Sequence, residues 1–99
     1  MSGKISKVMP NFPKERYMML MADKMPILRR HLGINQGELA ELIGASRQMI
    51  SLIERKERVM LWDTFMSLIA LFRINPATRE LVVFMEIYTD ELHRYLKIT

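Results

Sequence analysis

Four polar residues gather in the first turns of a helix predicted over residues 46–54, and their side chains can donate and accept hydrogen bonds. They are Ser46, Arg47, Gln48 and Ser51. Ile50 and Ile53 recur at helical spacing and are expected to face inward, which leaves the polar residues exposed. An arginine can bond two acceptors on guanine, a glutamine can pair with adenine, and a helix N-terminus favours phosphate. The pattern therefore suits base edges in the major groove of a DNA duplex.

Local signals predict the elements that position this polar turn. Asn35 and Glu38 are three residues apart, as in a capping box, and Ser46 is a second N-cap candidate. Gly44 lies between them, where glycine adopts without strain the left-handed conformation that ends a helix. Ala40 is small enough to let two helix axes approach closely. The sequence therefore predicts two short helices joined by a tight turn.

These two helices and their surroundings carry a long, ordered motif. Its members are Gln36, Glu38, Leu39, Ala40, Gly44, Ser46, Arg47, Ile50, Ser51, Ile53 and Glu54, with Trp62 and Leu68 extending it. With these residues the chain resembles the phage-repressor or Cro-type (Xre-like) helix-turn-helix family over about residues 21–75. The resemblance implies an all-α, lambda-repressor-like domain that binds double-stranded DNA.

The resemblance also implies roles for individual residues. The base-reading residues are Arg47, Gln48 and Ser51, and the phosphate-binding residues are Gln36, Ser46, Lys56 and Arg58. Arg29 and Glu54 occupy the positions of a structural ion pair. The chain departs from the family pattern after the recognition helix, where Arg55 and Lys56 replace a common Asn-Gly pair. Leu61 and Arg73 likewise replace a Ser or Thr and a Gly, which puts the limits of the fourth helix in doubt.

The rest of the chain predicts a compact bundle of about five helices with an added C-terminal helix. A flexible basic tail is expected at 1–12, a helix-turn-helix domain at 13–75 and a helical extension at 76–99. Pro13 is expected to open a short helix ending near Leu20, and Asp23 to cap a second helix with Pro26 in its first turn. The tail is either an unstructured terminus or a basic arm that touches the DNA backbone.

The C-terminal extension carries an apolar seam spaced by 4, 3, 4 and 3 residues. Its members are Leu81, Met85, Tyr88, Leu92 and Tyr95. The seam suits a helix from Asn75–Pro76 toward Leu96, with a break near Thr89–Asp90 or a strand over 81–88 as alternatives. The same face can pack on its own domain or form the interface of a homodimer.

Composition bounds the remaining classes of function. The 99 residues hold no cysteine, and no apolar run reaches the roughly 18 residues that a membrane span needs. Residues 1–34 carry seven Lys/Arg against two Asp/Glu, so the net charge of +4 lies mainly in the first third. The two histidines, His31 and His93, are isolated, and the serines lack a nearby base. We expect no enzyme activity, no metal or other cofactor, no membrane contact and a cytoplasmic, nucleoid-associated protein.

The function expected from these observations is sequence-specific DNA binding by a transcriptional regulator, most simply a repressor. A homodimer on a palindromic operator suits this function, because one recognition helix covers only a few base pairs. The alternative is an antitoxin that binds a small protein partner through its C-terminal extension and also binds its own operator.

Overall fold

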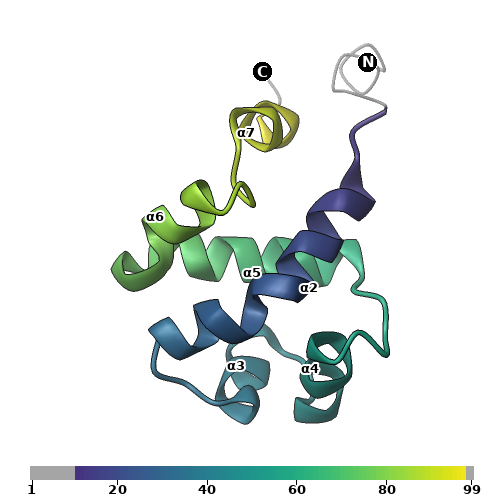
Figure 1. The fold of residues 1–99 in the computed structure, drawn as a ribbon, viewed down its shortest axis with the longest axis vertical. Helices are drawn as coiled ribbons and strands as arrows, with labels where there is room; N and C mark the ends of the chain where they lie inside the picture. Colours follow the sequence, from purple (N-terminus) through teal and green to yellow (C-terminus); the bar gives the residue numbers. More distant parts are fainter. Residues whose placement is uncertain (1–10, 98–99) are drawn as a thin grey trace.

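The structure, a computed structural model, describes residues 11–97, and within this range it has six helices and no strand. The helices are α2 (Lys14–His31), α3 (Gln36–Ile43), α4 (Arg47–Glu54), α5 (Trp62–Ile74), α6 (Pro76–Phe84) and α7 (Asp90–Leu96). Figure 1 shows α5 across the middle with α2 crossing it, α3 and α4 below, and α6 and α7 above. Over residues 11–97 the predicted all-α class is confirmed. No helix within 11–97 is long and apolar enough to cross a membrane.

A single apolar core joins these helices. It is built from the inward faces of α2 and α5, and α3 and α4 close it from one side. The fully buried large side chains are Tyr17, Met21, Met25, Leu28, Leu39, Ile50, Ile53, Phe65, Leu68, Phe72, Ile87 and Leu92. Because α3 and α4 have only eight residues each, neither is expected to be stable alone, and this shared core keeps both helical.

The prediction of two helices before Gly33 is wrong, because α2 runs without interruption through Asp23 and Pro26. Tyr17, Met21 and Met25 recur every four residues on one face and are all buried. Burial of such side chains contributes roughly 1.5–3 kcal/mol each, and together they outweigh the roughly 3 kcal/mol cost of an internal proline. Asp23 is therefore an exposed residue in mid-helix and not an N-cap.

The expected continuous helix is wrong, and so is the alternative strand over 81–88, because α6 ends at Phe84 and α7 begins at Asp90. The alternative of a break near Thr89–Asp90 is confirmed, with Thr89 as the N-cap of α7. Glu86 takes a left-handed conformation (φ 63°), and Ile87 turns fully into the core. The seam residues Leu81, Met85, Tyr88, Leu92 and Tyr95 thus lie on two helices and the segment between them. Leu92 is fully buried and the other four pack half-buried against the core, so they do not form one exposed stripe for a dimer.

The expected tail at 1–12 lies outside the described residues except for its last two positions. Of these, Phe12 is buried, not free. Its ring stacks on Tyr17 from α2 and on Tyr95 from α7, with ring centroids 5.0 and 4.2 Å apart. The start of the described chain is therefore packed between the first and last helices.

Tyr17 ties α2 to α7 through its hydroxyl group as well as its ring. The hydroxyl is hydrogen-bonded to Thr89 Oγ1 and donates to Glu91 Oε1 at 2.9 Å. Thr89 in turn caps α7, since its Oγ1 accepts from the backbone N–H of Leu92 at 3.0 Å. Burial raises the pKa of the Tyr17 phenol, and Glu91 adds to this rise. The phenol is thus held in its protonated form.

Replacing Tyr17 by phenylalanine is expected to lower the free energy of unfolding by about 1 kcal/mol, because two hydrogen-bond partners are lost. Because the phenol pKa is raised in the folded state, Tyr17 contributes stability that is fully present below about pH 10 and is lost as the pH rises further. The variant has no phenol at this position, so its free energy of unfolding should fall less between about pH 10 and 11. Urea denaturation at about pH 7 to 11 measures both effects.

The matched control is Tyr95→Phe, which keeps the stacked ring of another tyrosine. Equal effects of the two substitutions would contradict a special role for the Tyr17 hydroxyl.

Candidate nucleic-acid interface

Side-chain caps fix the geometry of the segment from Asn35 to Ser46. The Asn35 side chain accepts from the backbone N–H of Glu38 at 2.8 Å, and Glu38 accepts from the backbone N–H of Asn35 at 2.9 Å. Gly44 is left-handed (φ 74°), and its conformation turns the chain from α3 toward α4. Ser46 Oγ then accepts from the backbone N–H of Met49 at 3.1 Å, which caps α4. The two caps and the turn predicted from the sequence are all present.

The first turn of α4 presents its polar side chains to solvent. Ser46, Arg47 and Gln48 are exposed, whereas Ile50 and Ile53 are buried beneath them. The stem of Arg47 lies beside the first turn of α3, because a Cβ placed on Gly37 would be 3.5 Å from Arg47 Cδ. A cationic side chain and the first turns of two helices are thus adjacent, which is a favourable place for an anion.

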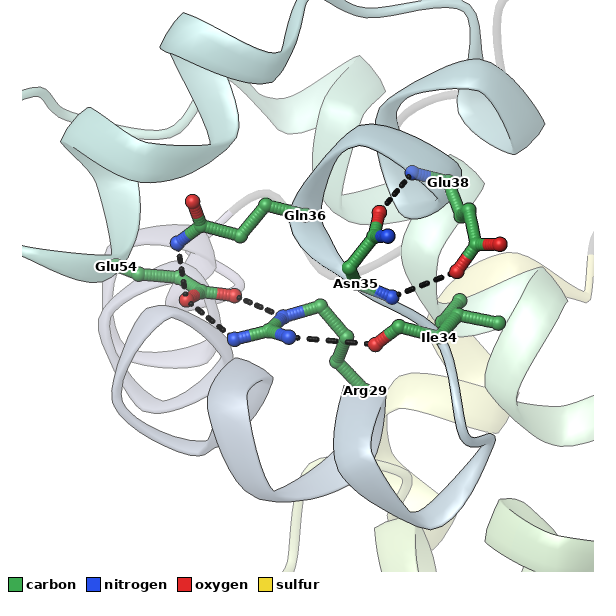
Figure 2. Close-up of polar contacts among 6 residues, drawn as sticks. All are labelled: Arg29, Ile34, Asn35, Gln36, Glu38 and Glu54. Atoms are coloured by element: carbon green, nitrogen blue, oxygen red, sulfur yellow. Dashed lines mark hydrogen bonds and ion pairs between the residues drawn. The ribbon is translucent and has the colours of Figure 1, made fainter.

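The other end of α4 is held by the buried carboxylate of Glu54 (Figure 2). Arg29 of α2 donates to both carboxylate oxygens, from Nε at 3.0 Å and from Nη2 at 3.1 Å. Their side chains are only 14% and 6% exposed, so the ion pair is shielded from solvent. Arg29 also donates to the Ile34 carbonyl at 3.3 Å, which holds the loop before α3. The two residues expected to pair therefore do so, and they connect three elements.

Two predicted DNA-contacting side chains have partners within the protein. Gln36 donates from Nε2 to Glu54 Oε1 at 2.9 Å and so completes the cluster in Figure 2. Ser51 is half-buried, and its Oγ accepts from Arg55 Nη1 at 2.9 Å. Contact of Gln36 with a phosphate has to use its remaining amide atoms, and contact of Ser51 with a base has to share its hydroxyl group.

The loop after α4 holds the other two predicted phosphate contacts. Arg58 is exposed, whereas Lys56 Nζ lies 2.9 Å from Asp23 Oδ1 on α2. The hydrogen bond from Lys56, followed by its charge, holds the pKa of the Asp23 carboxyl below its usual value. Lys56 is left-handed (φ 63°), the conformation that glycine adopts most easily.

Sequence reasoning missed the carboxylates that face this loop. Asp23 pairs with Lys56 across 33 residues, and Arg55 donates to Glu57 at 3.2 and 3.3 Å. The Arg55–Glu57 spacing was visible in the sequence, but the Asp23–Lys56 contact depends on an uninterrupted α2. A helix that began at Asp23 would not have placed this side chain beside Lys56, so the contact was not predicted.

The chain matches no protein-family model, and no curated protein or solved structure is similar to it at a significant level.

Replacing Glu54 by alanine is expected to lower the free energy of unfolding by about 3 to 5 kcal/mol, because it leaves the Arg29 guanidinium buried without its counter-ion. Chemical denaturation measures the change. The matched control is Glu57→Ala, which removes an exposed carboxylate from Arg55 and should cost at most about 1 kcal/mol. Similar losses for both variants would mean that the Arg29–Glu54 pair has no special weight.

Replacing Lys56 by glycine is expected to raise the free energy of unfolding by about 1 kcal/mol. Relief of the left-handed conformation contributes about 1–2 kcal/mol, and loss of the exposed pair with Asp23 offsets part of it. Arg55→Gly is the control, because Arg55 has φ −84° and gains nothing from glycine. Thermal denaturation compares the two, and destabilisation by both would refute strain at Lys56.

Proposed function

We propose that the chain is a lambda-repressor-like helix-turn-helix protein that binds double-stranded DNA sequence-specifically and regulates transcription, most simply as a repressor. In this proposal α3, the turn at 44–46 and α4 are the DNA-binding unit. The first turn of α4 enters the major groove, where Arg47 and Gln48 read base edges and Ser51 lies one turn further.

The observation that carries the proposal is the contrast between the two ends of α4. Its first turn is polar and exposed, with Arg47 and Gln48 free to approach a ligand, whereas its last residue is fixed by Arg29 and Gln36. A helix held rigidly at one end with a polar free tip suits reading of base pairs, because recognition depends on a fixed angle of approach. Arg58 and the loop at 55–58 supply positive charge for the DNA backbone.

The proposal includes two copies of the protein on one operator. An eight-residue helix is about 12 Å long and therefore covers few base pairs. Two copies one helical turn apart, about 34 Å, read a palindrome and combine their affinities.

A second candidate function is binding of a small protein partner, as an antitoxin binds its toxin. The observation that favours it is Phe84, a residue that is 84% exposed at the end of α6, beside Val83 at 43%. Solvent-exposed aromatic residues are frequent at protein interfaces. Figure 1 places α6 across α5 from α3 and α4, so such a partner would leave the DNA-binding unit accessible.

The test begins with selection of bound sequences from a random DNA pool, followed by titration of the selected duplex and a scrambled duplex at one salt concentration. Arg47→Ala and Gln48→Ala should each reduce the preference for the selected duplex, by about 1–3 kcal/mol at the base that they contact. Lys56→Ala should weaken binding to both duplexes by the same factor.

Arg94→Ala is the control, because Arg94 is an exposed cation on α7, away from α3 and α4. If Arg47→Ala and Gln48→Ala leave the preference unchanged, the base-reading surface lies elsewhere. If the protein selects no sequence and binds no duplex at low salt, the proposed function is wrong.

A further inference from the structure

The cations that follow α4 are partly neutralised within the protein itself. Lys56 Nζ is 2.9 Å from Asp23 Oδ1, and Arg55 Nε is 3.2 Å from Glu57 Oε2. A loop that attracts phosphates gains from free cations, so carboxylates at this position oppose binding. The Asp23–Lys56 pair stands out because its two residues come from different elements, α2 and the loop after α4.

The backbone holds Lys56 where its ammonium group meets Asp23. Its N–H donates to the Ile53 carbonyl at 3.0 Å, and its left-handed conformation bends the loop at the end of α4. Asp23 lies in the middle of α2, an 18-residue helix packed on α4, so its backbone has a fixed position too. The contact is therefore built by two ordered segments.

The same contact is open to exchange. The side chains of Lys56 and Asp23 are 57% and 51% exposed, and exposed ion pairs are weak. A phosphate oxygen is an acceptor of the same kind as a carboxylate oxygen and can replace it on the ammonium group. After such an exchange Asp23 keeps Lys24, whose Nζ is 3.5 Å from Oδ2, but loses its shorter contact.

The geometry points to Asp23 as an internal counter-ion that competes with DNA phosphate for Lys56 and thereby limits the affinity of the protein for DNA. This inference rests on the proposed DNA-binding function and adds an affinity-setting residue that touches no DNA. It predicts a specific signature in salt dependence. A phosphate contact by a free lysine releases a counter-ion from DNA and adds about −0.9 to the log–log slope. In the wild type, salt also screens the Asp23–Lys56 pair, so rising salt weakens the competitor and offsets part of that contribution.

The test is titration of a fluorescent duplex of arbitrary sequence over a range of salt concentrations, with wild type, Asp23→Asn, Lys56→Ala and the double variant. Asp23→Asn should bind about fivefold more tightly at low salt, because Lys56 no longer has to leave an exposed ion pair in order to reach a phosphate. Its slope should be steeper, by at most about 0.9. Both gains should vanish when Lys56 is alanine.

Glu80→Gln is the matched control. It removes one exposed carboxylate from α6, which lies across α5 from α3 and α4. A circular dichroism melt of each variant shows that the fold is intact. If Asp23→Asn and Glu80→Gln act alike, or if the gain persists without Lys56, the inference is overturned.

The outcomes separate this inference from the proposed function. Binding by the wild type with no gain in Asp23→Asn refutes the counter-ion and leaves DNA binding standing. Binding by Asp23→Asn that exceeds a very weak wild type supports both. Absence of binding by every variant at low salt refutes both.

Discussion

The geometry of the candidate interface depends on the buried ion pair between the Glu54 carboxylate and Arg29. Glu54 is the last residue of α4, where the helix dipole disfavours negative charge. Arg29 supplies the compensating charge from the last turn of α2, and Gln36 supplies a further donor from the first residue of α3. One side chain thus fixes the relative positions of three helices. The polar tip of α4 has a defined direction because these contacts hold its opposite end.

The charges around this unit are divided between two different tasks. The Arg29–Glu54 pair is buried and holds helices together. The Lys56–Asp23 and Arg55–Glu57 pairs are exposed and set the electrostatic potential of the surface. Water and salt screen the exposed group strongly and the buried group weakly. Ionic strength should therefore tune attraction between the loop and an anionic ligand while leaving the helix angles unchanged.

Local chemistry could be predicted from the sequence where one side chain decides the backbone. The Asn35–Glu38 box, the left-handed Gly44 and the Ser46 cap depend only on neighbouring residues and were found at their predicted positions. The Arg29–Glu54 pair followed from a family resemblance, because no local rule links residues 25 positions apart. The continuity of α2 through Pro26 could not be predicted, since burial of Tyr17, Met21 and Met25 decides it.

The same limit explains the C-terminal region. Five apolar residues at heptad-like spacing suggested one helix, but Ile87 is drawn into the core and the chain bends around it. Tertiary burial overrode a periodic pattern that was only two heptads long. Glu86 takes a left-handed backbone conformation at this bend.

The stack of Phe12 between Tyr17 and Tyr95 has a consequence for how the chain melts. Rings from the beginning and the end of the described chain share one cluster with Trp62, to which Lys14 adds a cation–π contact at 5.2 Å. Separation of α7 from the body would expose aromatic surface on α2 and α5 at once. α7 therefore covers aromatic side chains of the first and middle helices, and its loss would leave their rings exposed to water.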